Sequence, residues 1–137
     1  MTRDITDFLG RYTVTRRIDD RLAGTGATFE GRAEIAGEGP GAVYREVGTL
    51  SIAGKSFEAE RRYLWRMDGE RIAVAFEDGR PFHSFDPRRG GAAEEHLCGD
   101  DLYRGGYDLS DWPAWTLTWT VTGPRKDYTS VTRLVRG

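Results

Sequence analysis

The sequence predicts an all-β protein, a single up-and-down antiparallel β-barrel of about ten strands with a short N-terminal helical turn. Apolar and polar residues alternate with a period of two along most of the chain, which is typical of half-buried strands. Turn-forming pairs such as Asp68-Gly69 and Asp78-Gly79 separate these runs, and no helical run long enough to connect parallel strands lies between them. A meander of strands loses its exposed edges when it closes on itself, so we expect a barrel. A two-sheet β-sandwich is the alternative that the period leaves open.

The N-terminal segment is expected to form a helical turn that covers one end of the barrel. Ile5, Phe8 and Leu9 share one side of a helix over residues 3–9, and Gly10 follows at a position where helices often end. The period then changes to two. The first strand carries an arginine on its apolar face, which consists of Tyr12, Val14, Arg16 and Ile18.

The same alternation predicts the remaining strands. The clearest is the strand over residues 115–121, because its apolar residues alternate with threonines. The pattern is weakest between residues 81 and 108, where it does not indicate which side chains face inward. The expected strands cover residues 27–35, 44–52, 57–67, 72–76, 82–85, 92–98, 102–108, 115–121 and 128–136.

Composition narrows the classes of function. The 137 residues are expected to form one domain over 1–137 with one core. The net charge is −2 and no basic cluster occurs, which argues against a nucleic-acid partner. No apolar stretch approaches the roughly 20 residues that span a bilayer. The N-terminus lacks the apolar core of a secretion signal, and Cys98 is the only cysteine, so we expect a cytoplasmic protein without an internal disulfide.

Several charged or polar residues fall on the apolar faces of the predicted strands. They are Arg16, Glu46, Arg61, Tyr63 and, in the last strand, Arg133. An unpaired buried charge costs several kcal/mol, so these groups must pair with one another, be solvated or meet a ligand. One hypothesis is an internal network in which Glu46 pairs with Arg16 or Arg61. The other, which we favour because three arginines face one acid, is an anion site.

The favoured hypothesis is a cavity that binds an anionic or amphipathic small molecule with a carboxylate or phosphate group. Arginines would hold the charge, aromatic rings would form the wall, and histidines and a tyrosine would orient the ligand. The sequence identifies neither the ligand nor a cofactor. The predicted ligand contacts are Arg16, Arg61, Tyr63, Trp65, His83, His96, Tyr103 and Trp119.

Other functions remain open for the segment His96–Tyr107. An enzyme of the same fold would use His96 or His83 as a base, Asp101 to orient it, and Tyr103 or Tyr107 as an acid or polarising group. No Gly-x-Ser-x-Gly elbow supports a nucleophilic hydrolase. We expect no metal site and take Cys98 as a small core residue. A third alternative is a filled barrel that acts as a subunit-interaction module, for example in a homo-oligomer.

The two ends of the chain resemble the calycin superfamily, which includes the lipocalins and the fatty-acid-binding proteins. Gly10-Arg11-Tyr12 opens the first strand after the helical turn and resembles the family's Gly-x-Trp motif, with Tyr12 in the tryptophan position. Arg133 or Arg136 would be the family's last-strand arginine that packs across this ring. The resemblance implies a ligand cavity in the barrel, and in fatty-acid-binding relatives an interior arginine and tyrosine hold the acid group.

A haem-binding variant exists among calycin-like proteins, and His83 or His96 could supply its axial histidine. The chain as a whole also resembles a small bacterial family of unknown function, which implies no activity. That second resemblance is clearest in three segments: Phe8–Arg11, His96–Arg104 and Thr122–Tyr128.

Overall fold

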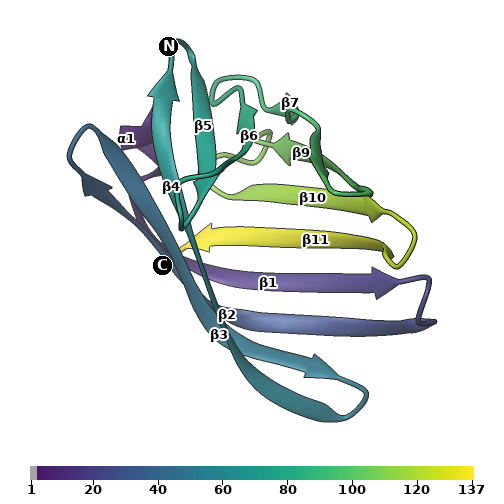
Figure 1. The fold of residues 1–137 in the computed structure, drawn as a ribbon. Coiled ribbons are helices and arrows are strands. Elements are labelled where there is room, and N and C mark those ends of the chain that lie inside the picture. The colour runs from purple at the N-terminus through teal and green to yellow at the C-terminus, as the bar shows by residue number, and fades with distance from the viewer. Residues whose placement is uncertain (1–2) are drawn as a thin grey trace.

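The computed structural model describes residues 3–137 and consists of one short helix followed by strands (Figure 1). The helix α1 spans Ile5–Phe8. The strands are β1 (Gly10–Asp20), β2 (Thr25–Glu38), β3 (Gly41–Ile52), β4 (Lys55–Asp68), β5 (Arg71–Phe76), β6 (Pro81–Phe85), β7 (Gly91–Ala92), β8 (His96–Cys98), β9 (Asp101–Asp108), β10 (Trp115–Thr122) and β11 (Asp127–Arg136).

The strands form one antiparallel sheet that curls into a nearly closed barrel (Figure 1). Their order is β6-β5-β4-β3-β2-β1-β11-β10-β9-β7, with β8 paired to β9. The first strand therefore pairs with the last, as Tyr12 opposite Arg136 shows. Between the two ends of this order, the backbone amide of Glu94 donates to the carbonyl of Ser84 at 2.9 Å. The predicted all-β barrel is confirmed, and the alternative sandwich is excluded.

The helix α1 begins and ends at identifiable residues and closes one end of the barrel. The Asp4 carboxylate accepts from the Thr6 amide, and Asp7 returns a hydrogen bond to the Asp4 amide, so the helix starts with a capping box. Leu9 is already extended, so the helix is shorter than the predicted turn over residues 3–9. Phe8 is fully buried and packs edge-on against aromatic rings of the barrel wall: Trp65, Phe85, Trp112 and Trp115.

The predicted contact between the first and last strands is present at this closed end. The guanidinium of Arg136 lies 5.2 Å from the centre of the Tyr12 ring and also donates to the backbone carbonyl of Leu9. The Tyr12 hydroxyl donates to the Phe8 carbonyl at 2.6 Å. These bonds fix the helix to the barrel.

The inward face predicted for most long strands is confirmed, with two corrections. Arg133 does not face inward, because Ser130, Thr132 and Leu134 are the buried residues of β11; its side chain bonds Asp111 on the outside. Cys98 is exposed and is not a core residue.

Two facing glycines allow β2 and β3 to approach closely. A Cβ atom on Gly31 would lie 2.7 Å from the Cα atom of Gly48 and would collide with the Val47 carbonyl. We therefore expect Gly31→Ala to lower the free energy of unfolding by about 1–3 kcal/mol. The matched variant Gly37→Ala in the same strand should change it little, because only Leu9 lies near that position, at 3.7 Å. Urea unfolding of both variants tests this, and equal losses would contradict it.

Candidate ligand-binding site

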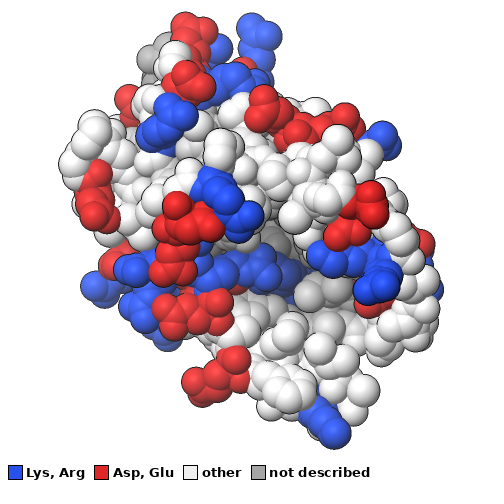
Figure 2. Space-filling model, viewed as in Figure 1, with Lys and Arg blue, Asp and Glu red and all other residues white. Residues whose placement is uncertain are grey.

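Two neighbouring cavities lie inside the barrel, one near its middle and one nearer the end opposite α1. The inner cavity measures about 50 Å³ and the outer one, which opens at the end opposite α1, about 730 Å³. Figure 2 shows a hollow in the middle of the face turned toward the viewer, with Lys and Arg side chains gathered at it. The residues that line both cavities, and so form their junction, are Arg16, Arg61, Tyr63, Phe82, Trp119 and Ser130.

All eight predicted ligand contacts line these cavities, so the structure brings them together. Trp65 and His83 line the inner cavity, and His96 and Tyr103 line the outer one. The remaining four belong to the junction: Arg16, Arg61, Tyr63 and Trp119. That these residues bind a ligand stays a prediction.

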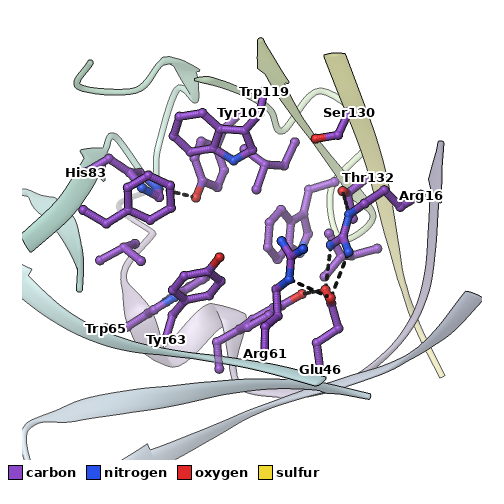
Figure 3. Close-up of a pocket in the computed structure, with 16 residues that line it drawn as sticks. Arg16, Glu46, Arg61, Tyr63, Trp65, His83, Tyr107, Trp119, Ser130 and Thr132 are labelled. Carbon is purple, nitrogen blue, oxygen red and sulfur yellow. Dashed lines mark hydrogen bonds and ion pairs between the residues drawn. The ribbon is translucent and has the colours of Figure 1, made fainter. Parts of the chain in front are cut away.

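A buried ion pair lies at the junction (Figure 3). Glu46 is 1% exposed and accepts two hydrogen bonds from the Arg16 guanidinium, at 2.9 and 2.7 Å. The Tyr44 hydroxyl donates to the same carboxylate at 2.6 Å, and Arg16 Nε donates to the Thr132 hydroxyl at 2.7 Å. The internal network predicted for Glu46 is therefore present, and it fixes β1, β3 and β11 relative to one another.

The network keeps both members of the pair charged. Burial raises the pKa of Glu46, but the hydrogen bonds and the charge of Arg16, with a further contribution from Arg61, outweigh it, so the pKa lies below its usual value. Burial likewise disfavours the charged form of Arg16, but its hydrogen bond to Glu46 and the charge of that carboxylate raise the pKa of the guanidinium. Burial is also the main reason that the pKa of Tyr44 is well above its usual value, so its hydroxyl stays protonated and can donate.

Arg61 is the second cation beside Glu46, and it is held more loosely. Its Nε lies 3.4 Å from the Glu46 carboxylate, and its side chain is 49% exposed. Among the side chains that Figure 3 draws, no dashed contact reaches its two terminal nitrogens. Because Arg16 already balances Glu46, the guanidinium of Arg61 is the surplus positive charge of this cluster.

His83 lies deep in the wall and is neutral. Its Nε2 is 2.8 Å from the Tyr107 hydroxyl, whereas its Nδ1 has no hydrogen-bond partner within residues 3–137. Burial, followed by the charges of His96 and Arg71, lowers the pKa of His83 to about 3. Burial raises the pKa of Tyr107 well above its usual value, so the pair carries no charge at neutral pH.

An aromatic column forms the wall beside the junction. Phe76, Phe82 and Trp119 stack in succession, with ring centres 4.6 and 5.0 Å apart. His96 and Tyr103 meet the Phe82 ring edge-on at 5.2 and 5.9 Å. Because Phe82 comes from β6 and Trp119 from β10, the column covers the seam where the sheet is not closed by a strand ladder.

Several residues that line the cavities were not predicted as ligand contacts. Phe82 and Tyr107 lie where the pattern is weak, and Tyr107 was named only as a possible acid of the enzyme alternative. Ser130 and Thr132 share a face with Leu134, but the opposite face carries Val131 and Val135, so the alternation favoured the wrong face.

The groups predicted for catalysis do not form the expected arrangement. Asp101 pairs with Lys126 at 3.3 Å, and Lys126 also donates to the Tyr103 hydroxyl at 3.2 Å. Within the described part of the chain, Asp101 has no hydrogen bond to His96, so the structure does not contain the orientation of His96 by this acid that the enzyme alternative requires.

The comparisons with known proteins give a family and a fold. Residues 8–136 match the model of a family of unknown function, DUF6314. The chain belongs to this family. No curated protein matches the DUF6314 chain.

Two solved structures share the fold of this DUF6314 chain. One is an S-type phycobiliprotein lyase from Guillardia theta, with a TM-score of 0.65 and 8% identity over 97% of this chain and 90% of that one. The other is a DUF3598 protein of unknown function from Nostoc punctiforme, with a TM-score of 0.59 and 12% identity over 97% of this chain. The DUF6314 chain spans about half (48%) of the DUF3598 protein. Among residues 3–137, no helix has the length and apolar character to cross a membrane.

Proposed function

We propose that this DUF6314 chain binds a small anionic, amphipathic molecule, with the acid group at Arg61 and the apolar body among the aromatic rings of the barrel. The surplus charge of Arg61 carries this proposal. Arg16 and Glu46 neutralise each other, whereas the terminal nitrogens of Arg61 remain available at the junction of the two cavities. Arginine forms strong paired hydrogen bonds with carboxylates, and an aromatic wall suits an apolar body.

The roles of the other contacts follow from their positions. Trp65 and Trp119 would form walls for the apolar body, and Tyr63 would donate to the acid group. His83 would use its unpartnered Nδ1 toward a polar atom that enters the inner cavity. His96 and Tyr103 would contact the part of the ligand that lies nearer the opening.

Two further observations support binding over the alternatives. An outer cavity of about 730 Å³ is within the usual range for ligand sites, whereas a filled barrel would leave no such space. The fold is shared with a phycobiliprotein lyase, which is compatible with small-molecule binding and does not identify a ligand.

Calorimetric titration with 1-naphthylacetate tests the proposal, with its uncharged methyl ester as the comparison ligand. We expect the wild type to bind the acid more tightly than the ester. Arg61→Leu should weaken binding of the acid by roughly 10- to 100-fold and leave binding of the ester nearly unchanged, because a charge-assisted hydrogen bond is lost.

Arg62→Leu is the matched control. Its side chain is 48% exposed, close to the 49% of Arg61, but it lies on the opposite face of β4 and pairs with Glu77. We expect this variant to bind both ligands as the wild type does. Equal binding of acid and ester by the wild type, or equal losses in the two variants, would overturn the proposal.

A further inference from the structure

We infer that the site selects an acid group with a single negative charge, a carboxylate, over a doubly charged group such as a phosphate monoester, and that Glu46 determines this selectivity. The inference rests on the proposed function and goes further by naming the class of the ligand's acid group.

The charges at the junction add up to one positive charge. Arg16 and Arg61 contribute two, and the buried carboxylate of Glu46 removes one. Two other charged groups line the outer cavity and add no free positive charge, because Arg80 pairs with Asp78 at 2.7 Å and Asp20, at the end of β1, is an acid. The Asp20 carboxylate accepts from the backbone amides that follow it in the turn, at 3.1 and 3.0 Å.

A second negative charge on the ligand would meet Glu46. A ligand acid bound to the terminal nitrogens of Arg61 lies on the same guanidinium whose Nε is 3.4 Å from the Glu46 carboxylate. One ligand charge is balanced by Arg61, but a second has no cation left to balance it and is repelled by Glu46. Glu46 is 1% exposed, so water screens the charge of its carboxylate little.

The hydrogen-bonding groups of the junction also suit a carboxylate. The Tyr63 and Ser130 hydroxyls line both cavities, and no contact to either is drawn among the residues of Figure 3. Both oxygens of Glu46 already have two partners each, from Arg16, Tyr44 and Arg61. The junction therefore offers donors to a ligand, while both oxygens of its buried carboxylate already accept from protein donors and are not free to accept a hydrogen bond from a ligand hydroxyl.

Phosphate sites commonly use backbone amides at a helix N-terminus or in a loop. Here helix α1 covers the opposite end of the barrel, and Arg61, Tyr63 and Ser130 lie within β4 and β11. Ser130 is paired on both sides, with β1 and β10, and Arg61 is paired with Glu46 of β3, whereas β5 pairs with β4 only from Tyr63 onward.

The test compares two ligands that share one aromatic body, 1-naphthylacetate and 1-naphthyl phosphate, by calorimetry on the intact chain. At about pH 8 the phosphate is a dianion, and at about pH 5.5 it is mostly a monoanion, because its second pKa is near 6. We expect the acetate to bind roughly tenfold or more tightly than the phosphate at the higher pH, and this gap to narrow at the lower pH. The acetate stays a monoanion at both pH values and so serves as the control for changes in the protein.

Glu46→Gln tests the role of the carboxylate, since it removes the charge and keeps the shape. At the higher pH we expect it to bring the affinity for the phosphate to within a few-fold of that for the acetate. Circular dichroism shows whether the variant is folded. If it is not, the pH comparison in the wild type decides alone.

The outcomes separate this inference from the proposed function. If both anions bind more tightly than the uncharged methyl ester, but the phosphate dianion binds as tightly as the acetate, the inference is wrong and the proposed function stands. If neither anion binds more tightly than the ester, the proposed function fails as well. A gap between the two anions that does not narrow at the lower pH would also overturn the inference.

Discussion

Arg16→Met is expected to lower the free energy of unfolding by about 3–5 kcal/mol, because it leaves the buried Glu46 carboxylate without its main partner. Arg16 supplies two of the hydrogen bonds to that carboxylate, and Glu46 is 1% exposed, so water does not replace them. Urea unfolding at neutral pH measures the loss.

Two comparison variants show what causes the loss of stability in Arg16→Met. In the double variant Arg16→Met/Glu46→Leu no unpaired charge remains, so most of the lost stability should return. Arg45→Met removes another Arg–Glu pair, in which Arg45 Nε donates to Glu60 at 3.0 Å, but both of these side chains are 54% exposed. Its loss should stay below about 1 kcal/mol. A double variant that is less stable than the single one would show that Glu46 is not the source of the effect.

Acidification below about pH 6.5 should destabilise the protein through His83. Its pKa is about 3 in the folded protein, chiefly because of burial, and 6.5 is the ordinary value for an exposed histidine. Between these two values the unfolded chain binds a proton that the folded protein does not, so stability falls as the pH falls. The loss from this group is about 1.4 kcal/mol per pH unit within that window.

The prediction is checked by the pH dependence of urea unfolding in the wild type and in His83→Gln. Carboxyl groups contribute to both curves, so the difference in stability between the two proteins at each pH is the quantity compared. We expect the His83→Gln curve to be flatter than the wild-type curve between about pH 6.5 and pH 5. Parallel curves for the wild type and His83→Gln would mean that His83 takes up its proton as readily in the folded protein as in the unfolded chain.

The period-two pattern predicted the barrel and most inward faces because one face of each long strand is strongly apolar. In β1, Arg16 follows Tyr12 and Val14 on a buried face, so its burial could be read directly from the sequence. The same rule failed in β11. There Val131 and Val135 are exposed while Ser130 and Thr132 are buried, so the polarity of the two faces is reversed. Arg133, which lies on the same face as the two valines, was therefore assigned to the wrong face.

The wall between residues 81 and 108 could not be oriented from the sequence for a different reason. Phe82 and His83 are adjacent and both buried, which simple alternation does not allow. The register between β5 and β6 shifts between Val74 and Ala75, and such an irregularity can re-aim side chains toward the interior. The neighbouring strands β7 and β8 have only two and three residues, too few to show a period.

Which arginine pairs with Glu46 was predicted from the sequence only as two alternatives. Alternation places Glu46, Arg16 and Arg61 on inward faces, but it does not give the distances between strands that are far apart in sequence. The structure shows that both arginines contact Glu46. Arg16 does so through both terminal nitrogens, whereas Arg61 does so through Nε alone. This difference is what makes Arg61 the anion-binding candidate.

The most direct test of anion binding at Arg61 is an NMR titration of the ¹⁵N-labelled protein with 1-naphthylacetate. It follows the Nε–H signals of the arginines and the indole N–H signals of the tryptophans. We predict that the signals of Arg61 and Trp119 shift together and saturate with one ligand per chain, while that of Arg62 on the outer face does not move. Shifts confined to exposed arginines such as Arg62 and Arg45, with Arg61 unchanged, would contradict a ligand acid group bound inside the barrel.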